Sequence, residues 1–405
     1  MNIKKFYLYQ MFKDLMPIYP LYQLMFDNKG LSLAHISMLL AIWSVPAVLL
    51  EIPTGVIADH WSRRNLMFLG GLLKASCFLV WIFSEGFILY AVGFILWGIS
   101  SSLQSGAEEA LLYDSLKVEG QEERFDLILG RGRFVSGISN LFSSLLGGFI
   151  GMKFGFELAL GLSVGSSLIT AGIALAMKEV NLYKDNLSEQ PEVQDKDTLR
   201  NALSFLFRNK KIFLFSLLTL IVITTAGVLD EYDQLIAQDY GLSIGLIGIW
   251  TAIRFILMAI GGFVAGWLRR SIEKILRIKD KMYNISFMCL IAALFLVIAG
   301  LVKHINIMWL YGLYFMIMSS GEVLQEDYIQ QNIEDEGRST VHSVIALSQN
   351  LYGIICFGLF GMIASGAGLH AGLIWCGVYI IIWTVVLGFV YAVINKRKHN
   401  KISSR

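Results

Sequence analysis

The sequence predicts an all-α membrane protein with twelve transmembrane helices in two six-helix bundles. Apolar residues make up 56% of the 405-residue chain, and charged residues make up only 16%. Apolar stretches of about 20 residues recur along the whole chain, and a helix needs that length to cross a bilayer core roughly 30 Å thick. One long polar segment separates six of these stretches from the other six.

The predicted spans follow the apolar stretches in order. They cover residues 6–26, 33–57, 66–83, 87–113, 133–152, 157–177, 212–232, 243–267, 283–301, 306–330, 341–364 and 370–394. The polar segment carries mixed charges, so we expect a cytoplasmic linker there and no packed domain. The predicted division is an N-terminal bundle (1–177), a linker (178–211), a C-terminal bundle (212–395) and a basic cytoplasmic tail (396–405).

The first span begins like a signal peptide, with two lysines before an apolar run. Lys13 and Asp14 interrupt that run, and no small-residue cleavage site follows. We therefore expect a first helix that is retained in the protein.

The placement of basic residues predicts the orientation. With the N-terminus inside, 27 of the 33 Lys and Arg residues fall in cytoplasmic segments, and only Lys29, Lys153 and Lys303 lie outside. Lys and Arg in short loops are retained on the cytoplasmic side of a membrane. We expect a multi-pass protein of the cell membrane with both termini in the cytoplasm.

The loop between the second and third spans carries Gly55, Asp59, Arg63 and Arg64. This pattern resembles the loop between the second and third helices of the major facilitator superfamily, Gly-x-x-x-Asp-Arg/Lys-x-Gly-Arg-Arg/Lys. Ser62 stands where the family has glycine, and serine lacks the access of glycine to positive φ, which leaves the turn geometry open. Taken alone, these residues also fit an ordinary charged cytoplasmic turn.

The resemblance implies a gate at this loop. Asp114 ends the fourth span, where superfamily members with the loop motif have an acid that meets the loop's charges. The resemblance thus assigns Gly55, Asp59, Arg63, Arg64 and Asp114 to a gating charge cluster. A desolvated charge pair with two discrete arrangements can hold the cytoplasmic side shut and release it when the bundles move.

The two halves of the chain share a repeated pattern. Residues 105–113 and 320–328 both begin with Ser-Gly and end with Tyr, and each segment lies at the end of its span. An acidic turn with one arginine follows each of them. Transporter folds are commonly built from duplicated units with the binding site between them. The resemblance to the superfamily therefore covers nearly the whole chain, and it is specific for the fold rather than for a substrate.

Charged residues inside the predicted spans mark candidate sites, because each costs about 2.5–3.5 kcal/mol at the centre of a membrane helix. In the first span, Gln10 and Asp14 share a helix face, and Pro17 and Pro20 follow and open the helix locally. We interpret Asp14 as part of a substrate or proton site. The alternative is that Lys13 extends to the interface and Asp14 is merely solvated.

Polar stripes at helical spacing mark the fourth and tenth spans. One contains Ser101, Gln104, Ser105 and Glu108, with Glu109 beside it, and the other contains Glu322, Gln325, Glu326 and Gln330. In the superfamily, spans one, four, seven and ten line the central cavity, so the resemblance places both stripes there. Both stripes also fit helix ends that protrude from the hydrocarbon.

Three further charges lie near the middle of spans. Arg254 in the eighth span needs an acidic partner; we expect Glu322, with Asp230 or Glu231 as alternatives. A structural pair and a role in coupling are both open for Arg254. Glu51 and Lys74 lie at similar depth in adjacent spans and are expected to neutralise each other.

Other chemistry finds no support in the sequence. No phosphate-binding Gly-x-x-x-x-Gly-Lys-Ser/Thr segment is present, so direct use of ATP is not expected. The six histidines lack metal-ligand spacing, and the four cysteines lie in apolar spans as buried thiols. We expect no enzymatic activity, no cofactor, no metal and no nucleic-acid partner, and we expect a monomer.

The resemblance implies a secondary transporter, with its closest likeness to bacterial drug–proton antiporter-type exporters. Part of that likeness is a glycine-rich fifth span, although small residues permit close helix contact in any membrane protein. The resemblance implies proton-coupled export of a small lipophilic compound, and an excess of acids over bases inside the spans predicts that this compound is cationic. Asp14, Glu322 and either Glu108 or Glu109 are the expected binding groups. The alternatives are nutrient uptake, flipping of a lipid-linked substrate, and a receptor that transports nothing.

Overall fold

The computed structural model describes residues 2–182, 209–332 and 338–403. Every regular element in these residues is a helix. The chain forms two compact units. Unit 1 is Met1–Glu192 together with Gly241–Ala252, and unit 2 is Val193–Tyr240 together with Ile253–Arg405.

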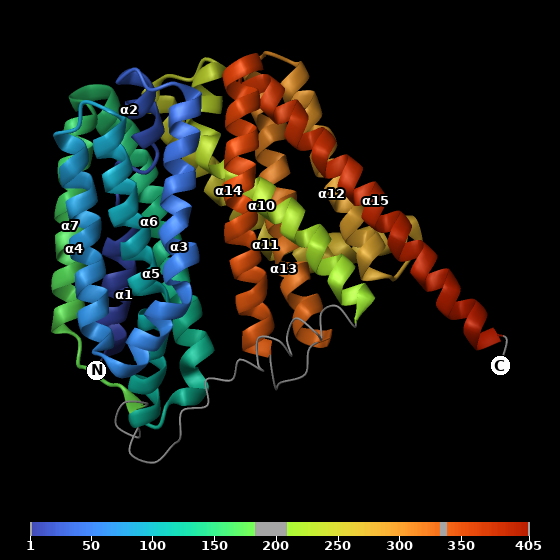
Figure 1. The fold of residues 1–405 in the computed structure, drawn as a ribbon, viewed down its shortest axis with the longest axis horizontal. Helices are drawn as coiled ribbons and strands as arrows, with labels where there is room; N and C mark the ends of the chain where they lie inside the picture. Colours follow the sequence, from blue (N-terminus) through green and yellow to red (C-terminus); the bar gives the residue numbers. More distant parts are fainter. Residues whose placement is uncertain (1, 183–208, 333–337, 404–405) are drawn as a thin grey trace. The chain divides into compact units, whose positions relative to one another are not determined.

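Unit 1 contains seven α-helices in the described residues (Figure 1). They are α1 (Asn2–Asp14), α2 (Tyr22–Asn28), α3 (Leu33–His60), α4 (Arg63–Ile82), α5 (Phe87–Val118), α6 (Phe125–Phe154) and α7 (Phe156–Ala176). A short 3-10 helix, η1 (Glu122–Arg124), precedes α6. Helix α5 packs against α3 and α4, α4 also packs against α7, and α1 contacts α6 and α7.

Unit 2 contains six α-helices in the described residues. They are α10 (Lys210–Asp239), α11 (Ile244–Leu276), α12 (Lys281–Leu301), α13 (Met308–Asn332), α14 (Arg338–Ala367) and α15 (Leu369–Ser403), with a 3-10 helix η2 (Ile305–Ile307) before α13. The start of α11, up to Ala252, belongs to unit 1. Helix α12 packs against α13 and α15, and α10 contacts α13, α14 and α15.

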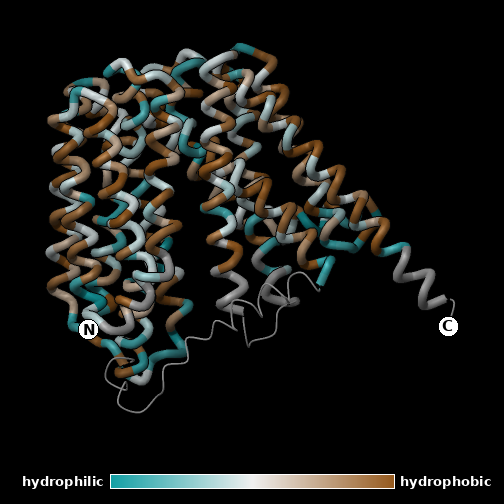
Figure 2. Tube along the Cα trace, viewed as in Figure 1, coloured by the Kyte–Doolittle hydropathy of each residue, from teal (hydrophilic) through white to brown (hydrophobic). Residues whose placement is uncertain are grey.

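Eleven helical segments in the described residues are long and apolar enough to cross a membrane, and they coincide with the second to twelfth predicted spans. Figure 2 shows apolar residues recurring along these helices. The first predicted span differs, because residues 6–26 form two helices with a break between them. Pro17 and Pro20 lie in that break, where proline removes amide donors and cannot continue a helix. The prolines open the first span, as the sequence predicts, and the opening extends over residues 15–21.

Matching turns occur in the two units. Gly155 joins α6 to α7 and Gly368 joins α14 to α15, and both have a φ of +87°. A residue with a Cβ is strained at this φ, so each turn favours glycine. A glycine with positive φ thus connects the fifth span to the sixth and the eleventh span to the twelfth.

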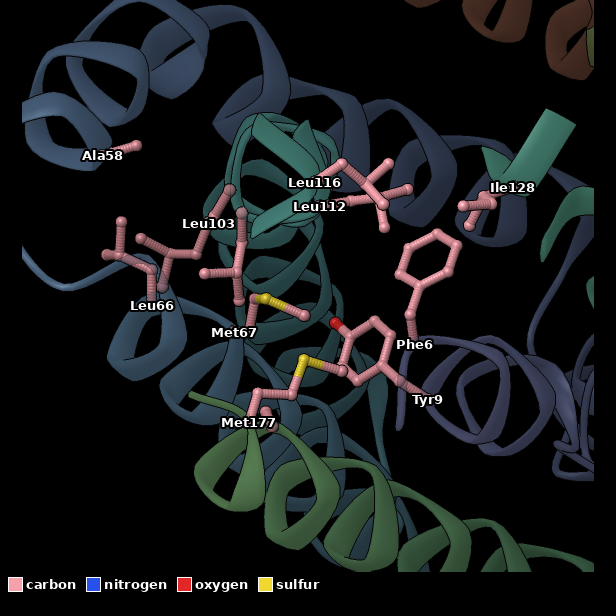
Figure 3. Packing of buried hydrophobic residues seen from close by; sticks show 13 residues of the cluster. Phe6, Tyr9, Ala58, Leu66, Met67, Leu103, Leu112, Leu116, Ile128 and Met177 are labelled. Atoms are coloured by element: carbon pink, nitrogen blue, oxygen red, sulfur yellow. The ribbon is translucent and has the colours of Figure 1, made fainter. Parts of the chain in front are cut away.

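A cluster of buried apolar side chains fixes one end of unit 1 (Figure 3). Phe6 and Tyr9 of α1 meet Leu66 and Met67 of α4, together with Leu112 and neighbouring leucines of α5. The cluster holds the start of α1 against the end of α5. This packing sets the height at which the polar residues farther along the two helices face each other.

The four cysteines, Cys77, Cys289, Cys356 and Cys376, are buried free thiols, as the sequence predicts. In the described residues, no group of three His, Cys, Asp or Glu side chains is placed to hold a metal ion.

Candidate functional site

A cavity of about 410 Å³ lies inside unit 1, between α1, α4, α5 and α7. Its charged lining residues are Lys13, Asp14, Lys74, Glu108 and Glu109. Gln104, several hydroxyl side chains and two aromatic rings complete most of the wall. A polar cavity of this size inside a bundle of membrane-crossing helices is the candidate substrate site.

The break in the first span places Asp14 at the cavity. Helix α1 ends at Asp14, and neighbouring helices bind the backbone that the break exposes. Ser166 of α7 donates to the Phe12 carbonyl at 2.8 Å, and Ser163 of α7 accepts from the Ile18 amide at 3.2 Å. Irregular backbone is tolerated at membrane depth only where such partners satisfy it.

A salt bridge joins α1 to α5 at the cavity wall. The Lys13 ammonium lies 2.8 and 2.7 Å from the two carboxylate oxygens of Glu108. The side chains are 30% and 12% exposed, so the pair is partly shielded from solvent. The sequence did not identify this pairing, and Lys13 does not simply extend to the interface. Glu108 is therefore already neutralised by a cation of the protein.

The other two acids of the cavity lie in different surroundings. Asp14 accepts a hydrogen bond from the Ser136 hydroxyl of α6, and none of the described residues forms a salt bridge with it. Glu109 lies 3.3 Å from Arg133 in an exposed pair. Asp14 is thus the cavity carboxylate that forms no direct salt bridge in the described residues, although the Lys13 ammonium is close enough to attract it.

Aromatic rings contact a second cation in the cavity lining. The Lys74 ammonium lies 3.2 Å from the centroid of the Trp97 ring and 5.2 Å from that of Tyr19. The two rings stack with centroids 5.4 Å apart and an interplanar angle of 15°. The predicted partner of Lys74, Glu51, has a side chain outside the described residues. A cation–π contact at this distance stabilises a positive charge at the ring face.

Most hydroxyl groups of the cavity donate their hydrogen to another group of the protein. Ser100 donates to the Gly70 carbonyl at 2.7 Å, Ser167 to Ser163 at 2.8 Å and Thr170 to Ser166 at 2.9 Å. A hydroxyl has one hydrogen and two lone pairs. Towards a bound molecule these groups therefore act as hydrogen-bond acceptors.

The two predicted glutamines of unit 1 have different roles. Gln104 lines the cavity, accepts from the Tyr9 hydroxyl at 2.6 Å and donates to Ser100 at 2.7 Å. A Cβ at Gly70 would lie 2.6 Å from Gln104, so glycine makes room for this network. Gln10 is buried beside Gly132 of α6 and is not among the residues that line the cavity. Gln10 and Asp14 therefore do not share the cavity wall.

The charge cluster at the loop between α3 and α4 contains a buried pair. The Arg63 guanidinium lies 2.5 Å from an Asp114 carboxylate oxygen and 2.9 Å from the Ala110 carbonyl. The two side chains are only 6% and 10% exposed. The predicted contact between Arg63 and Asp114 is confirmed, whereas the surroundings of Gly55 and the Asp59 side chain are outside what the structure describes.

Residues 178–182, which we call the strap, bind this loop. The Glu179 carboxylate accepts from the Ser62 hydroxyl and from the Arg63 and Arg64 amides at 3.0 and 3.1 Å. Asn181 donates to the carbonyls of Ala58 and Trp61 at 3.1 and 3.0 Å. The strap thus binds both the start of α4 and the end of α3.

Two further contacts hold the strap on unit 1. The Leu182 amide donates to Asp114 at 2.9 Å, and Lys178 exchanges two backbone hydrogen bonds with the Asn2 side chain. Sequence reasoning assigned these residues to the linker and missed their role. The signal was the presence of Glu and Asn, which suit helix ends, directly after a predicted span.

Ser62 explains how the loop turns without the family's glycine. Its φ is −72°, and its side chain accepts from the Asn65 amide as the N-cap of α4. Serine is a favoured N-cap and needs no positive φ in this conformation. Arg64 is partly exposed, 4.0 Å from Glu179.

The candidates in unit 2 are arranged differently from the prediction. Arg254 forms ion pairs with Asp230 and with Asp233, the latter at 3.0 Å, so the expectation that Glu322 is its partner is wrong and the alternative Asp230 is confirmed. Consecutive helices joined by a short turn bring these residues together. Glu322 is exposed, Gln325 is buried, and the Glu326 side chain lies outside the described residues.

The sequence and the fold are similar to those of known proteins. The family model described as Major Facilitator Superfamily matches residues 8–357. An uncharacterized MFS-type transporter, YxaM of Bacillus subtilis (strain 168), is 21% identical over 394 residues, which cover 94% of this chain and 92% of that protein.

Two kinds of solved structure share the fold. A mutant form of the nucleoside transporter NupG has a TM-score of 0.75 at 14% identity, over 97% of this chain and 99% of that chain. An inward-facing, unoccupied bacterial homolog of the human lysosomal transporter Spinster has a TM-score of 0.73 at 14% identity, over 97% of both chains. At these identities the likeness concerns the fold alone.

Proposed function

This chain belongs to the major facilitator superfamily, a class of transporters and not of enzymes, and we propose that it exports a small cationic compound in exchange for protons. The cavity of unit 1 is the proposed substrate site. The observation that carries the proposal is the cavity's combination of acceptor groups with the carboxylate of Asp14, beside an aromatic face that the protein's own Lys74 occupies.

Hydrogen bonding in the cavity favours a cation. Among its charged lining residues, Glu108 pairs with Lys13 and Glu109 with Arg133, so Asp14 and Lys74 remain, one of each sign. The hydroxyls of Ser100, Ser167 and Thr170 offer lone pairs, so they suit a molecule that donates hydrogen bonds. An ammonium group supplies both the positive charge and the donors.

Asp14 supports the exchange with protons. A carboxylate in a low-dielectric cavity disfavours an uncompensated negative charge, so either a proton or a cationic substrate must accompany it. When the cavity opens to the other side of the membrane, the two occupants can be exchanged. This competition couples export of the cation to entry of a proton.

Asp14→Asn is expected to weaken binding of the cation by about tenfold or more, since about 1.4 kcal/mol of lost charge attraction corresponds to a factor of ten. Transport driven by a pH gradient should fall to background. The measurement is uptake of a labelled cation into inverted vesicles with and without the gradient. Asp126→Asn, at an exposed position near the start of α6, is the matched control. Full gradient-driven transport by Asp14→Asn would remove Asp14 from the mechanism.

Substrate charge provides a separate test. Among size-matched aromatic amines, neutral analogues and carboxylates, we expect the amine to bind on the order of tenfold tighter than its neutral analogue. The carboxylate should bind least, because acceptor groups and Asp14 repel it. Binding to the purified protein at low ionic strength measures this order. Equal or tighter binding of the carboxylate would contradict the cation preference.

Uptake of a polar ring compound is the second candidate. The stacked Tyr19 and Trp97 rings suit a planar ring, and the hydroxyls and Gln104 suit a solute that forms many hydrogen bonds. NupG, a protein whose structure shares this fold, is a nucleoside transporter. A nucleoside included in the same binding panel distinguishes the two functions. Only uptake of a polar ring compound predicts that the nucleoside competes with the amine for the cavity.

We further propose the topology and the gate that the sequence predicts. Both termini lie in the cytoplasm, and the protein acts as a monomer in the cell membrane. Arg63, Arg64 and Asp114, together with Gly55 and Asp59, form the cytoplasmic gate. The buried Arg63–Asp114 pair supports this role, because its opening requires solvation of both charges.

A further inference from the structure

Lys74 of α4 holds its ammonium group among three aromatic rings. The ammonium nitrogen lies 3.2 Å from the ring centroid of Trp97, 5.2 Å from that of Tyr19 and 5.6 Å from that of Phe78. A cation within about 6 Å of a ring centroid is attracted by the ring's electron density. We call these three rings the cage, and in this structure the cage contains a cation of the protein itself.

Three parts of unit 1 supply the cage. Phe78 follows Lys74 by one turn on the same face of α4, Trp97 belongs to α5, and Tyr19 lies in the break between α1 and α2. Lys74 is 8% exposed and Phe78 is fully buried. Lys74, Tyr19 and Trp97 also line the cavity. The cage therefore borders the proposed substrate site, and the Lys74 side chain fills it.

Other aromatic residues hold the Trp97 ring in place. It stacks on Phe94 with centroids 5.8 Å apart and an interplanar angle of 10°. It also makes edge contacts with Tyr22 and Trp43, at centroid distances of 5.8 and 5.9 Å. These ring contacts do not involve Lys74, so we expect the cage to keep its form when Lys74 is shortened.

The cage and the hydroxyl groups of the cavity suit different cations. A quaternary ammonium ion has no N–H group, and proteins bind such ions in aromatic boxes. An amine with N–H groups can instead donate to the lone pairs of Ser100, Ser167 and Thr170. A quaternary ion therefore depends on the cage, which is the place that Lys74 takes.

We propose that Lys74 is a specificity-determining residue whose ammonium occupies the cage and excludes quaternary ammonium ions from it. Amines bind beside the cage, at Asp14 and the hydroxyl acceptors. The inference rests on the proposed function, because it takes the cavity as the substrate site. It narrows the substrate class to cations that carry N–H groups.

The test is a gain of binding by a shortened side chain. Lys74→Ala frees the space of the ammonium and of most of its stem within the cage. The probe is choline, a quaternary ammonium ion, and equilibrium binding of labelled choline to the purified full-length protein is measured. Lys74→Ala should bind choline on the order of tenfold tighter than Lys74→Met does. The neutral isostere, with carbon in place of the nitrogen of choline, should bind equally weakly to both variants.

Lys74→Met is the matched control, since it removes the same charge but still fills the cage. A second control is Lys74→Ala combined with Trp97→Leu, which keeps the space but removes the ring closest to the cation. This double variant should lose the gain. Lys74→Val opens the cage with a larger side chain and replaces Lys74→Ala if the latter does not fold. Choline should also raise the unfolding temperature of the shortened variant, because a ligand stabilises the folded state that binds it.

Three results would overturn the proposal. Equal choline binding by Lys74→Ala and Lys74→Met would mean that only the charge of Lys74 matters. An equal gain for the neutral isostere would mean that only the space matters. Choline binding by the unmodified protein as tight as by Lys74→Ala would mean that Lys74 excludes nothing.

The same binding assay separates this inference from the proposed function. If Asp14→Asn binds the amine as well as the unmodified protein does, the proposed cation site at Asp14 fails, and the choline result still decides the role of Lys74. If Asp14→Asn loses the amine and Lys74→Ala gains no choline, the proposed function stands and the role given to Lys74 fails.

Discussion

Lys13→Met is expected to destabilise the protein and to abolish transport. The change leaves Glu108 charged and without its partner in the cavity wall, and removal of one partner from a buried pair costs about 3–5 kcal/mol. Lys13 is partly exposed, so we expect about 3 kcal/mol. Thermal unfolding in detergent measures the stability, and uptake into vesicles measures transport.

The double variant Lys13→Met with Glu108→Met distinguishes structure from transport. Replacement of a whole buried pair by apolar residues is often neutral, so stability should return to within about 1 kcal/mol of the original. Transport should stay lost if the Lys13–Glu108 pair takes part in transport as well as in stability.

The exposed pair Lys29–Glu157, 3.8 Å apart, is the matched control for this pair, and Lys29→Met should cost about 0.5 kcal/mol or less. A Lys13→Met variant as stable and active as the unmodified protein would show that the pair matters neither for structure nor for transport.

Arg63→Ala is expected to give the second large effect. It removes the partner of the buried Asp114, with an expected loss of about 3–5 kcal/mol, and it should shift the protein towards inward-facing states. Asp114→Asn should have the same direction, and the double variant should be much less harmful than the sum of the two. Distances between labels on the loops at this end of the helices measure the shift.

Arg64→Ala provides the control on the same loop. The Arg64 side chain is 34% exposed and 4.0 Å from Glu179, so its loss should cost about 1 kcal/mol or less. Additive effects of Arg63→Ala and Asp114→Asn, or equal effects of Arg63→Ala and Arg64→Ala, would contradict a gate built on the buried pair.

Hydropathy predicted most of the fold, because a long apolar stretch is enough to identify a membrane span. The exception was the first span. The sequence showed Pro17 and Pro20, but the extent of the break depends on partners for the freed backbone. Those partners are serines of α7, more than a hundred residues away, and single-sequence patterns do not reveal such contacts.

The sequence identified several residues of the candidate site but not the ion pairs that they form. Asp14, Gln104, Glu108 and Glu109 do line one cavity. The partner of Glu108 was missed because Lys13 was interpreted on its own helix alone. Lys13 and Glu108 lie at nearly the same distance from the start of α1 and the end of α5, and comparison of these depths could have paired them.

The pairing of Arg254 failed for a related reason. Glu322 lies on α13, far along the chain, and its depth relative to Arg254 depends on packing. Asp233 lies on α10, which is joined to α11 by a short turn, so the two residues are close by connectivity. Asp233 was not among the predicted partners of Arg254, which were Glu322, Asp230 and Glu231.

The strap determines where the chain can be divided into two polypeptides. A first fragment that stops at residue 177 would contain all the spans of the N-terminal half but would lack Glu179 and Asn181, which bind the start of α4 and the end of α3. A fragment that continues through Leu182 keeps these hydrogen bonds. For co-expression of the two halves, the natural junction therefore lies after the strap and not at the end of the last helix.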